Sequence, residues 1–153
     1  MNQYASLTIW IVVYLAVGFG IGYLTQGSID TWYAELDKPF FNPPNWIFPV
    51  MWSVLYVTIA MAGWRLWGVG APKEVKGLFI LYTFMNWAWT PIFFGLHEMM
   101  IGFFWIVAIN VINAIFLMKA WRSNQWAARL MIPVFLWTLF AAVLNHQIWM
   151  LNG

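Results

Sequence analysis

Three sets of aromatic and amide side chains recur at helical spacing, and together they could form a binding surface. Intervals of three and four residues put side chains on one face of an α-helix. The sets are Trp52 with Tyr56; Tyr82 with Asn86, Trp89 and Phe93; and Pro133 with Trp137, Ala141 and Asn145. Such faces suit a large, flat, mostly apolar ligand, bound by stacking and a few hydrogen bonds. The alternative is that they pack against one another as an aromatic core.

The residues needed for conventional catalysis or metal binding are poorly represented. The chain has no cysteine, which removes disulfides, thiolate catalysis and thiolate metal sites. No motif prepares a serine nucleophile, and all the carboxylates lie between the long apolar stretches. His97 beside Glu98 is a fragment of a metal site at most, and His146 is either an axial haem ligand or an interfacial hydrogen-bonding residue. We therefore expect no resident metal and no hydrolase.

The elements that position these side chains are predicted to be membrane-spanning helices. The 153 residues are 63% hydrophobic and 8% charged, which is more apolar surface than one small soluble core can bury. A helix needs about 20 residues to cross the hydrocarbon layer. Stretches of that size cover residues 6–25, 47–67, 77–96, 101–119 and 130–151. Their continuous apolarity favours helices over a barrel and predicts an all-α, five-transmembrane-helix bundle forming a single domain over residues 1–153.

The basic residues are distributed unevenly between the two membrane faces. Lys38 alone lies in the first connection, whereas the others lie in or beside the second and fourth connections: Arg65, Lys73, Lys76, Lys119, Arg122 and Arg129. The positive-inside rule then predicts a cytoplasmic N-terminus, and we expect the membrane to be a bacterial inner membrane. The net charge of +2 is too small to indicate nucleic acid as a partner.

The first connection, residues 26–46, is much longer than the others and is predicted to be an ordered capping loop. Its prolines restrict the backbone, and its aromatic residues supply apolar anchors. The alternative is an amphipathic segment held at the membrane surface by those aromatics. The residues concerned are Pro39, Pro43 and Pro44, and Trp32, Phe40, Phe41 and Trp46. In the preceding stretch, Gly18, Gly20 and Gly22 open a smooth strip that another helix or a flat ligand can approach closely, and Gly18 and Gly22 form a small-xxx-small pair.

These motifs resemble the TspO/MBR family, the tryptophan-rich sensory proteins, which are bacterial relatives of the mitochondrial translocator protein (the peripheral-type benzodiazepine receptor). The resemblance covers nearly the whole chain. Its specific pieces are Trp32-Tyr33 followed by Leu36, Lys38-Pro39 and Pro43-Pro44; Trp52 with Leu55-Tyr56; the continuous segment from Asn86 to Gly95; and Pro133, Trp137, Ala141 and Leu144-Asn145.

The resemblance implies a five-helix fold whose first connection caps a pocket for tetrapyrroles such as protoporphyrin IX and haem. It implies a membrane receptor or sensor acting in porphyrin metabolism, regulation or stress responses, and commonly a homodimer. The alternatives are light- and oxygen-dependent breakdown of protoporphyrin IX, or transport of porphyrin or another amphiphile. In each case the porphyrin is a ligand, and no tightly bound cofactor is expected. The chemistry of breakdown would belong to the porphyrin and oxygen, with the protein supplying position.

The resemblance and the aromatic faces together give a set of candidate site residues. Expected ligand contacts are Tyr33, Trp52, Tyr56, Asn86, Trp89, Phe93, Trp137, Ala141 and Leu144. Trp52 and Trp137 match the pair linked to photodegradation, and they would be catalytic only if that reaction occurs. The capping loop would use Trp32, Lys38, Pro39, Pro43 and Pro44, with Lys38 pairing either with a propionate or with Asp37 or Glu35. His146 replaces the tyrosine of the sterol motif of animal members, and no basic residue follows Arg129, which argues against sterol binding.

Overall fold

The computed structural model describes residues 2–153, which form an all-helical bundle without strands in that range. Its five long helices are α1 (Gln3–Ser28), α2 (Ile47–Gly68), α3 (Lys73–Thr90), α4 (Met99–Ser123) and α5 (Gln125–Asn152). Two π-helical segments continue α1 and α3 without a break in the chain: η1 (Ile29–Tyr33) follows α1, and η2 (Pro91–Gly95) follows α3. π-helical turns widen a helix locally and are frequent at functional sites.

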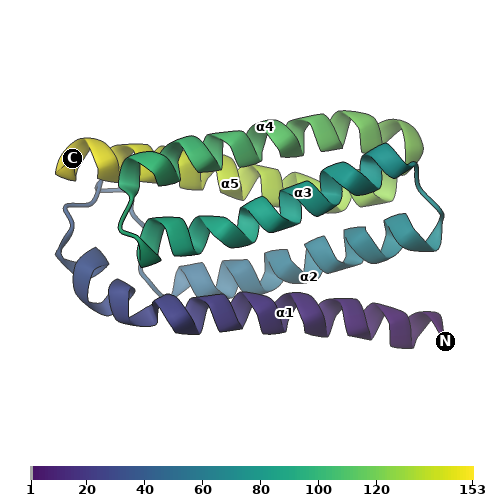
Figure 1. Cartoon of the computed structure of the whole chain (residues 1–153), viewed down its shortest axis with the longest axis horizontal. Helices are drawn as coiled ribbons and strands as arrows, with labels where there is room; N and C mark the ends of the chain where they lie inside the picture. The colour runs from purple at the N-terminus through teal and green to yellow at the C-terminus, as the bar shows by residue number, and fades with distance from the viewer. Residues whose placement is uncertain (1) are drawn as a thin grey trace.

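The five helices lie side by side along the long axis of the molecule, and the two termini lie at opposite ends (Figure 1). Contacts join α1 to α2, α2 to α5, α5 to α4, α4 to α3 and α3 back to α1, so the helices form a closed ring in that order. We call the end with η1, η2 and the C-terminus the capped end. The opposite end holds all the basic residues except Lys38, and we call it the basic end.

The basic half of the bundle has a solid core. Phe79 and Phe116 are buried and lie with their ring centroids 6.0 Å apart. Gly63 on α2 lets neighbouring helices approach closely, because a Cβ atom there would lie 2.8 Å from the Phe79 ring. Ala60 and Ala62 on the same helix are also fully buried. Small residues on α2 therefore let α1 and α3 pack closely against α2 at this end.

Four helices begin earlier than the apolar pattern predicts, and the difference is largest for α3 and α5. α3 starts at Lys73 rather than at residue 77, and α5 starts at Gln125 rather than at residue 130. Pro72 immediately precedes α3, and the Asn124 side chain caps α5 by accepting a hydrogen bond from the backbone N–H of Ala127. A capping side chain satisfies backbone N–H groups of the first turn, so a helix can start in polar sequence before its apolar stretch begins.

The predicted capping loop of residues 26–46 is wrong at its N-terminal side. Residues 26–35 are helical, and the irregular connection covers residues 36–46. Polar residues such as Gln26 and Asp30 suggested a loop. The helix continues through them because Tyr33 is buried against Phe93 and Phe94 of η2, with ring centroids 6.3 Å and 5.2 Å away. Tertiary packing here outweighs the local polarity of the sequence.

Four of the helical segments are long and apolar enough to cross a membrane: α1 with η1, α2, α4 and α5. α3 has 18 residues and carries Lys73, Glu74 and Lys76 near its start, which sets it apart from the others. Large apolar side chains are exposed around the bundle, among them Leu24 at 83% and Leu136 at 59%. So much exposed apolar surface indicates that lipid surrounds the bundle.

Candidate ligand-binding pocket

A cavity of about 710 Å³ lies inside the capped half of the bundle. The C-terminal half of α1, η1, the N-terminal half of α2, the junction of α3 with η2, and α5 all contribute side chains to it. Its size falls within the range of roughly 300–1,000 Å³ that is usual for pockets holding small molecules. The solid core of the basic half closes it from below, so the cavity belongs to one end only.

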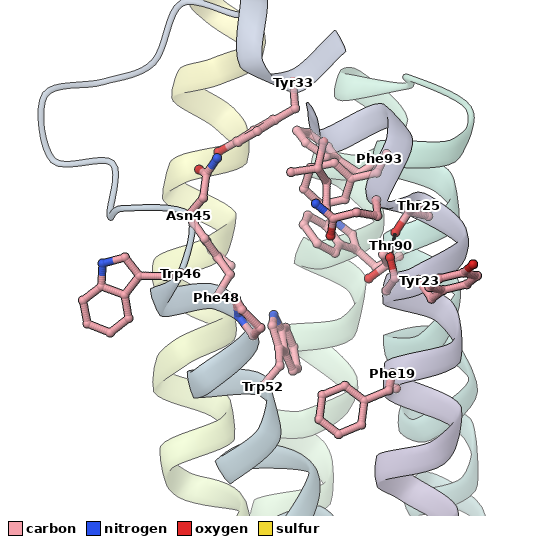
Figure 2. Close-up of a pocket in the computed structure, with 18 of the residues that line it drawn as sticks. Phe19, Tyr23, Thr25, Tyr33, Asn45, Trp46, Phe48, Trp52, Thr90 and Phe93 are labelled. Carbon is pink, nitrogen blue, oxygen red and sulfur yellow. Dashed lines mark hydrogen bonds between the residues drawn. The ribbon is translucent and has the colours of Figure 1, made fainter. Parts of the chain in front are cut away.

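Indole, phenol and phenyl rings form much of the cavity wall. Trp52 and Tyr56 come from α2, with ring centroids 5.5 Å apart, and both face the cavity. Trp89 of α3 and Phe93 of η2 form another part of the wall, with ring centroids 5.2 Å apart and an interplanar angle of 13°. Figure 2 shows Trp52 and Phe48 on α2 directed toward the space that Phe19 of α1 borders from the other side. Such a wall offers stacking surfaces to a flat ligand.

Trp137 brings α5 into the same wall. Its ring meets Phe48 of α2 edge to face, with centroids 6.1 Å apart. Its Nε1–H is buried and has no hydrogen-bond partner in the part of the chain that the structure describes. A buried indole N–H without a partner is costly, so the Trp137 ring carries an unsatisfied donor at the edge of the cavity wall.

Gly18 shows why α1 can lie so close to the aromatic wall. A Cβ atom at this position would lie 2.6 Å from Cδ2 of the Tyr56 ring, so only glycine lets that ring rest on the helix backbone. Gly22, one turn nearer the capped end, lines the cavity and has no atom within 4 Å of a Cβ built on it. Gly18 therefore contacts a ring and Gly22 borders open cavity, whereas the prediction is wrong for Gly20, which is exposed and does not line the cavity.

Tyr33 of η1 lies over the cavity at its capped end (Figure 2). Only 4% of the residue is exposed, and its hydroxyl donates a hydrogen bond to Oδ1 of Asn42 at 3.1 Å. Asn42 in turn donates to the carbonyl of Pro43 at 3.1 Å. This chain of bonds fixes the Tyr33 ring to the irregular connection that crosses the end of the bundle.

The connection of residues 36–46 is ordered and fastened to α5. The backbone N–H of Asp37 donates to Oδ1 of Asn152 at 2.9 Å, and Nδ2 of Asn152 donates to the carbonyl of Asp37 at 2.8 Å. Of the four predicted anchors, Trp32 and Phe41 pack against protein, whereas Phe40 is 100% exposed and Trp46 is 66% exposed. Trp46 still lines the cavity, although its ring extends outward from the start of α2 (Figure 2). Phe40 and Trp46 are therefore wrong as anchors of the cap.

The predicted capping residues build the cover but do not line the cavity. Nζ of Lys38 donates to the carbonyls of Ala34 and Leu36 and lies 4.8 Å from the centroid of the Tyr33 ring. Trp32 stacks on His97 with centroids 4.3 Å apart, and so joins η1 to the turn before α4. The carbonyls of Pro39, Pro43 and Pro44 accept hydrogen bonds within the connection.

A hydrogen-bonded junction of α3, α4 and α5 supports the wall. Nε1 of Trp89 donates to the carbonyl of Gly102 at 3.1 Å and to Oδ1 of Asn145 at 3.2 Å. Nδ2 of Asn145 donates to the carbonyl of Met99 at 2.9 Å. Because buried polar groups need partners, these bonds fix the orientation of the Trp89 ring at the cavity.

The structure brings eight of the nine predicted ligand contacts to this cavity. These eight are Tyr33, Trp52, Tyr56, Trp89, Phe93, Trp137, Ala141 and Leu144. Asn86 does not line it: the residue is buried one turn below Thr90 and accepts a 3.5 Å hydrogen bond from the Tyr82 hydroxyl. His146 also lies elsewhere, beside Phe103 at a ring centroid distance of 5.0 Å, so it does not present an axial ligand to this cavity.

Several cavity residues were not predicted, although the sequence carries a signal for some of them. Phe48 precedes Trp52 by four residues, and Ile148 follows Leu144 by four, so the same helical spacing finds both. The polar residues of the capped end, Thr25, Asp30 and Asn45, had no such signal. Within residues 2–153, no group of three His, Asp or Glu side chains is placed to hold a metal ion.

Comparison with known proteins places this architecture in a family. The family model described as "TspO/MBR family" matches residues 10–150, a range that contains α2, α3 and α4 and most of α1 and α5. The chain belongs to the TspO/MBR family. All the residues that line the cavity fall inside the matched range, so the pocket is part of the TspO/MBR domain of this chain.

Members of the TspO/MBR family from distant organisms are similar to this chain over most of its length. A tryptophan-rich protein TspO from Archaeoglobus fulgidus is 35% identical, with 94% of each chain covered. A translocator protein from Ovis aries is 36% identical over 83% of this chain and 78% of its own length. A tryptophan-rich sensory protein from Cereibacter sphaeroides is 29% identical, covering 84% of this chain and 83% of its own. With its apolar helices, family membership makes this chain a multi-pass membrane protein of the sensor and translocator class.

Proposed function

We propose that this protein is a membrane receptor that binds a tetrapyrrole, such as protoporphyrin IX or haem, in the cavity of the capped half. The observation that carries the proposal is the convergence of Trp52, Trp89 and Trp137 on one cavity beneath Tyr33. Indoles from three helices offer flat apolar surfaces in different orientations, and a macrocycle can stack on them. The names of the relatives, sensory protein and translocator protein, agree with a receptor that reports or moves a small molecule.

Tryptophan fluorescence provides the test. Titration of the purified protein with protoporphyrin IX in the dark is expected to quench tryptophan emission to saturation. Trp52→Phe and Trp137→Phe should each weaken binding about threefold to tenfold, because phenylalanine keeps an aromatic ring but loses stacking area. The measurement is the dissociation constant, obtained from the absorbance change of the porphyrin as well as from emission.

Trp126→Phe is the matched control for this titration. Trp126 is 62% exposed, lies near the start of α5 at the basic end and does not line the cavity. Its substitution should leave the dissociation constant unchanged. Equal weakening by all three substitutions, or binding that never saturates, would contradict a specific site in the cavity.

The positions of Trp52 and Trp137 support light- and oxygen-dependent breakdown of the bound porphyrin as a second candidate function. Both indoles line the cavity, and a ring next to a photoexcited macrocycle can donate an electron or a hydrogen atom to it. Illumination in air should then produce a new bilin-like absorbance. The Trp52→Phe, Trp137→Phe double variant should not form this product, even at porphyrin concentrations that saturate the binding site of the variant.

We also propose that all five helices cross the membrane with the basic end in the cytoplasm. α3 together with η2 runs from Lys73 to Gly95, which is long enough for a crossing. The charged residues of α3 lie near its start, at the basic end of the bundle. The positive-inside rule places that end in the cytoplasm and the cavity toward the opposite side, in a bacterial cell the periplasmic side of the inner membrane.

A further inference from the structure

The two ends of the bundle carry opposite charge. Four carboxylates and one ammonium group lie at the capped end, a formal charge of −3: Asp30, Glu35, Asp37 and Glu98 with Lys38. At the basic end, six basic side chains accompany Glu74 alone, a formal charge of +5. Clustered charges of one sign around a low-dielectric opening create a potential that attracts or repels an approaching ligand. A ligand that reaches the capped end therefore meets a negative field.

Asp30 carries this negative charge to the opening of the cavity, because the residue lines the cavity and is also exposed at the surface. It is the one charged residue among the described residues that line the cavity. Nε2 of Gln26, one turn earlier on the same helix, donates to its Oδ1 at 2.9 Å. Asp30 forms no salt bridge with any residue in the described part of the chain. The one salt bridge in that part joins Lys119 to Glu74 at the basic end. The carboxylate thus remains free to interact with a charged group on a ligand.

Lys38 does not compensate for this charge. Its ammonium group is held by the carbonyls of Ala34 and Leu36 and lies over the Tyr33 ring, and Lys38 does not line the cavity. A porphyrin carboxylate at the opening would therefore face Asp30 without a cation beside it. A positively charged group at the same place would gain an ion pair.

We propose that the cavity selects flat apolar ligands by the charge of the group at its opening, preferring a cationic group to an anionic one, with Asp30 as the residue that determines this preference. The proposal rests on the proposed function, since it concerns the ligand of the same cavity. It predicts that a porphyrin bearing free carboxylates binds less tightly than the same macrocycle with neutral or ammonium side chains.

The experiment compares ligands that share one macrocycle. Protoporphyrin IX, its dimethyl ester and a bis-amide derivative carrying two primary amines are titrated in the dark at low ionic strength, where charge effects are least screened. The expected order of affinity is amine, then ester, then acid, with steps of about threefold to tenfold, because the carboxylate is solvated and acts through an intermediate dielectric. Asp30→Asn should reduce both steps to less than about twofold.

Glu35→Gln is the matched control, because it removes the same formal charge from the capped end at a residue that does not line the cavity. It should preserve the order of affinity. Equal changes in Asp30→Asn and Glu35→Gln, or equal affinities for all three ligands in the unchanged protein, would overturn the selectivity role of Asp30. Failure of even the neutral ester to bind would instead overturn the proposed function, so the two failures are distinguishable.

Discussion

Gly22→Trp should reduce porphyrin binding by about tenfold or more while leaving the fold intact. Gly22 lines the cavity, and a Cβ atom there meets nothing within 4 Å, so the new indole enters open space without displacing the backbone. It would occupy the volume beside Phe19 that a macrocycle needs. Dark titration gives the binding change, and thermal unfolding in detergent shows whether the bundle is preserved.

Gly20→Trp is the appropriate control, because it adds the same side chain to the same helix on a different face. Gly20 is exposed, its Cβ would also meet nothing within 4 Å, and it does not line the cavity. Binding should remain at the level of the unchanged protein. If Gly20→Trp weakens binding as much as Gly22→Trp does, the ligand lies on the outer surface of α1 and the cavity is not its site.

Gly63→Ala should cause a large loss of stability for a single added methyl group. The new Cβ would lie 2.8 Å from the Phe79 ring, closer than carbon atoms pack. Phe79 is 1% exposed and cannot move aside without disturbing Phe116. Overpacking of this kind lowers the free energy of unfolding by about 1–3 kcal/mol. Unfolding in a detergent series, followed by tryptophan emission, measures the change.

Gly77→Ala provides the opposite result for comparison. Gly77 lies in α3, is exposed, and has open space at its Cβ position. Replacing a helical glycine with alanine there should raise the free energy of unfolding by about 0.5–1 kcal/mol, because the unfolded chain loses freedom. Loss of stability in Gly77→Ala equal to that in Gly63→Ala would mean that close packing at Gly63 is not the cause.

Much of the cavity wall follows from helical spacing alone. Trp52 and Tyr56, or Trp137 and Ala141, must share a helix face, and polarity and family resemblance indicate that those faces turn inward. Spacing identifies the face of a helix but not how far along the helix a cavity extends. For this reason the prediction includes Asn86, which shares a face with Trp89 but does not line the cavity. The cavity ends above it, where Tyr82 and the core of the basic half fill the space between the helices.

The capped end was harder to predict, because packing between distant segments determines it. The helix continues through the polar residues before Tyr33 since Tyr33 packs on η2, which follows almost sixty residues later in the chain. That continuation carries Asp30 to the cavity as part of η1. Local sequence contains no signal for either feature, so the one charge that lines the cavity could be found only from the three-dimensional arrangement.

A structure determined with protoporphyrin IX bound in the dark would locate the ligand. We expect planar density between Trp52 and Trp137, beneath the Tyr33 ring and in contact with the Gly22 backbone. A macrocycle bound on the lipid-facing surface, with the indoles packed together and the central space filled, would contradict this expectation.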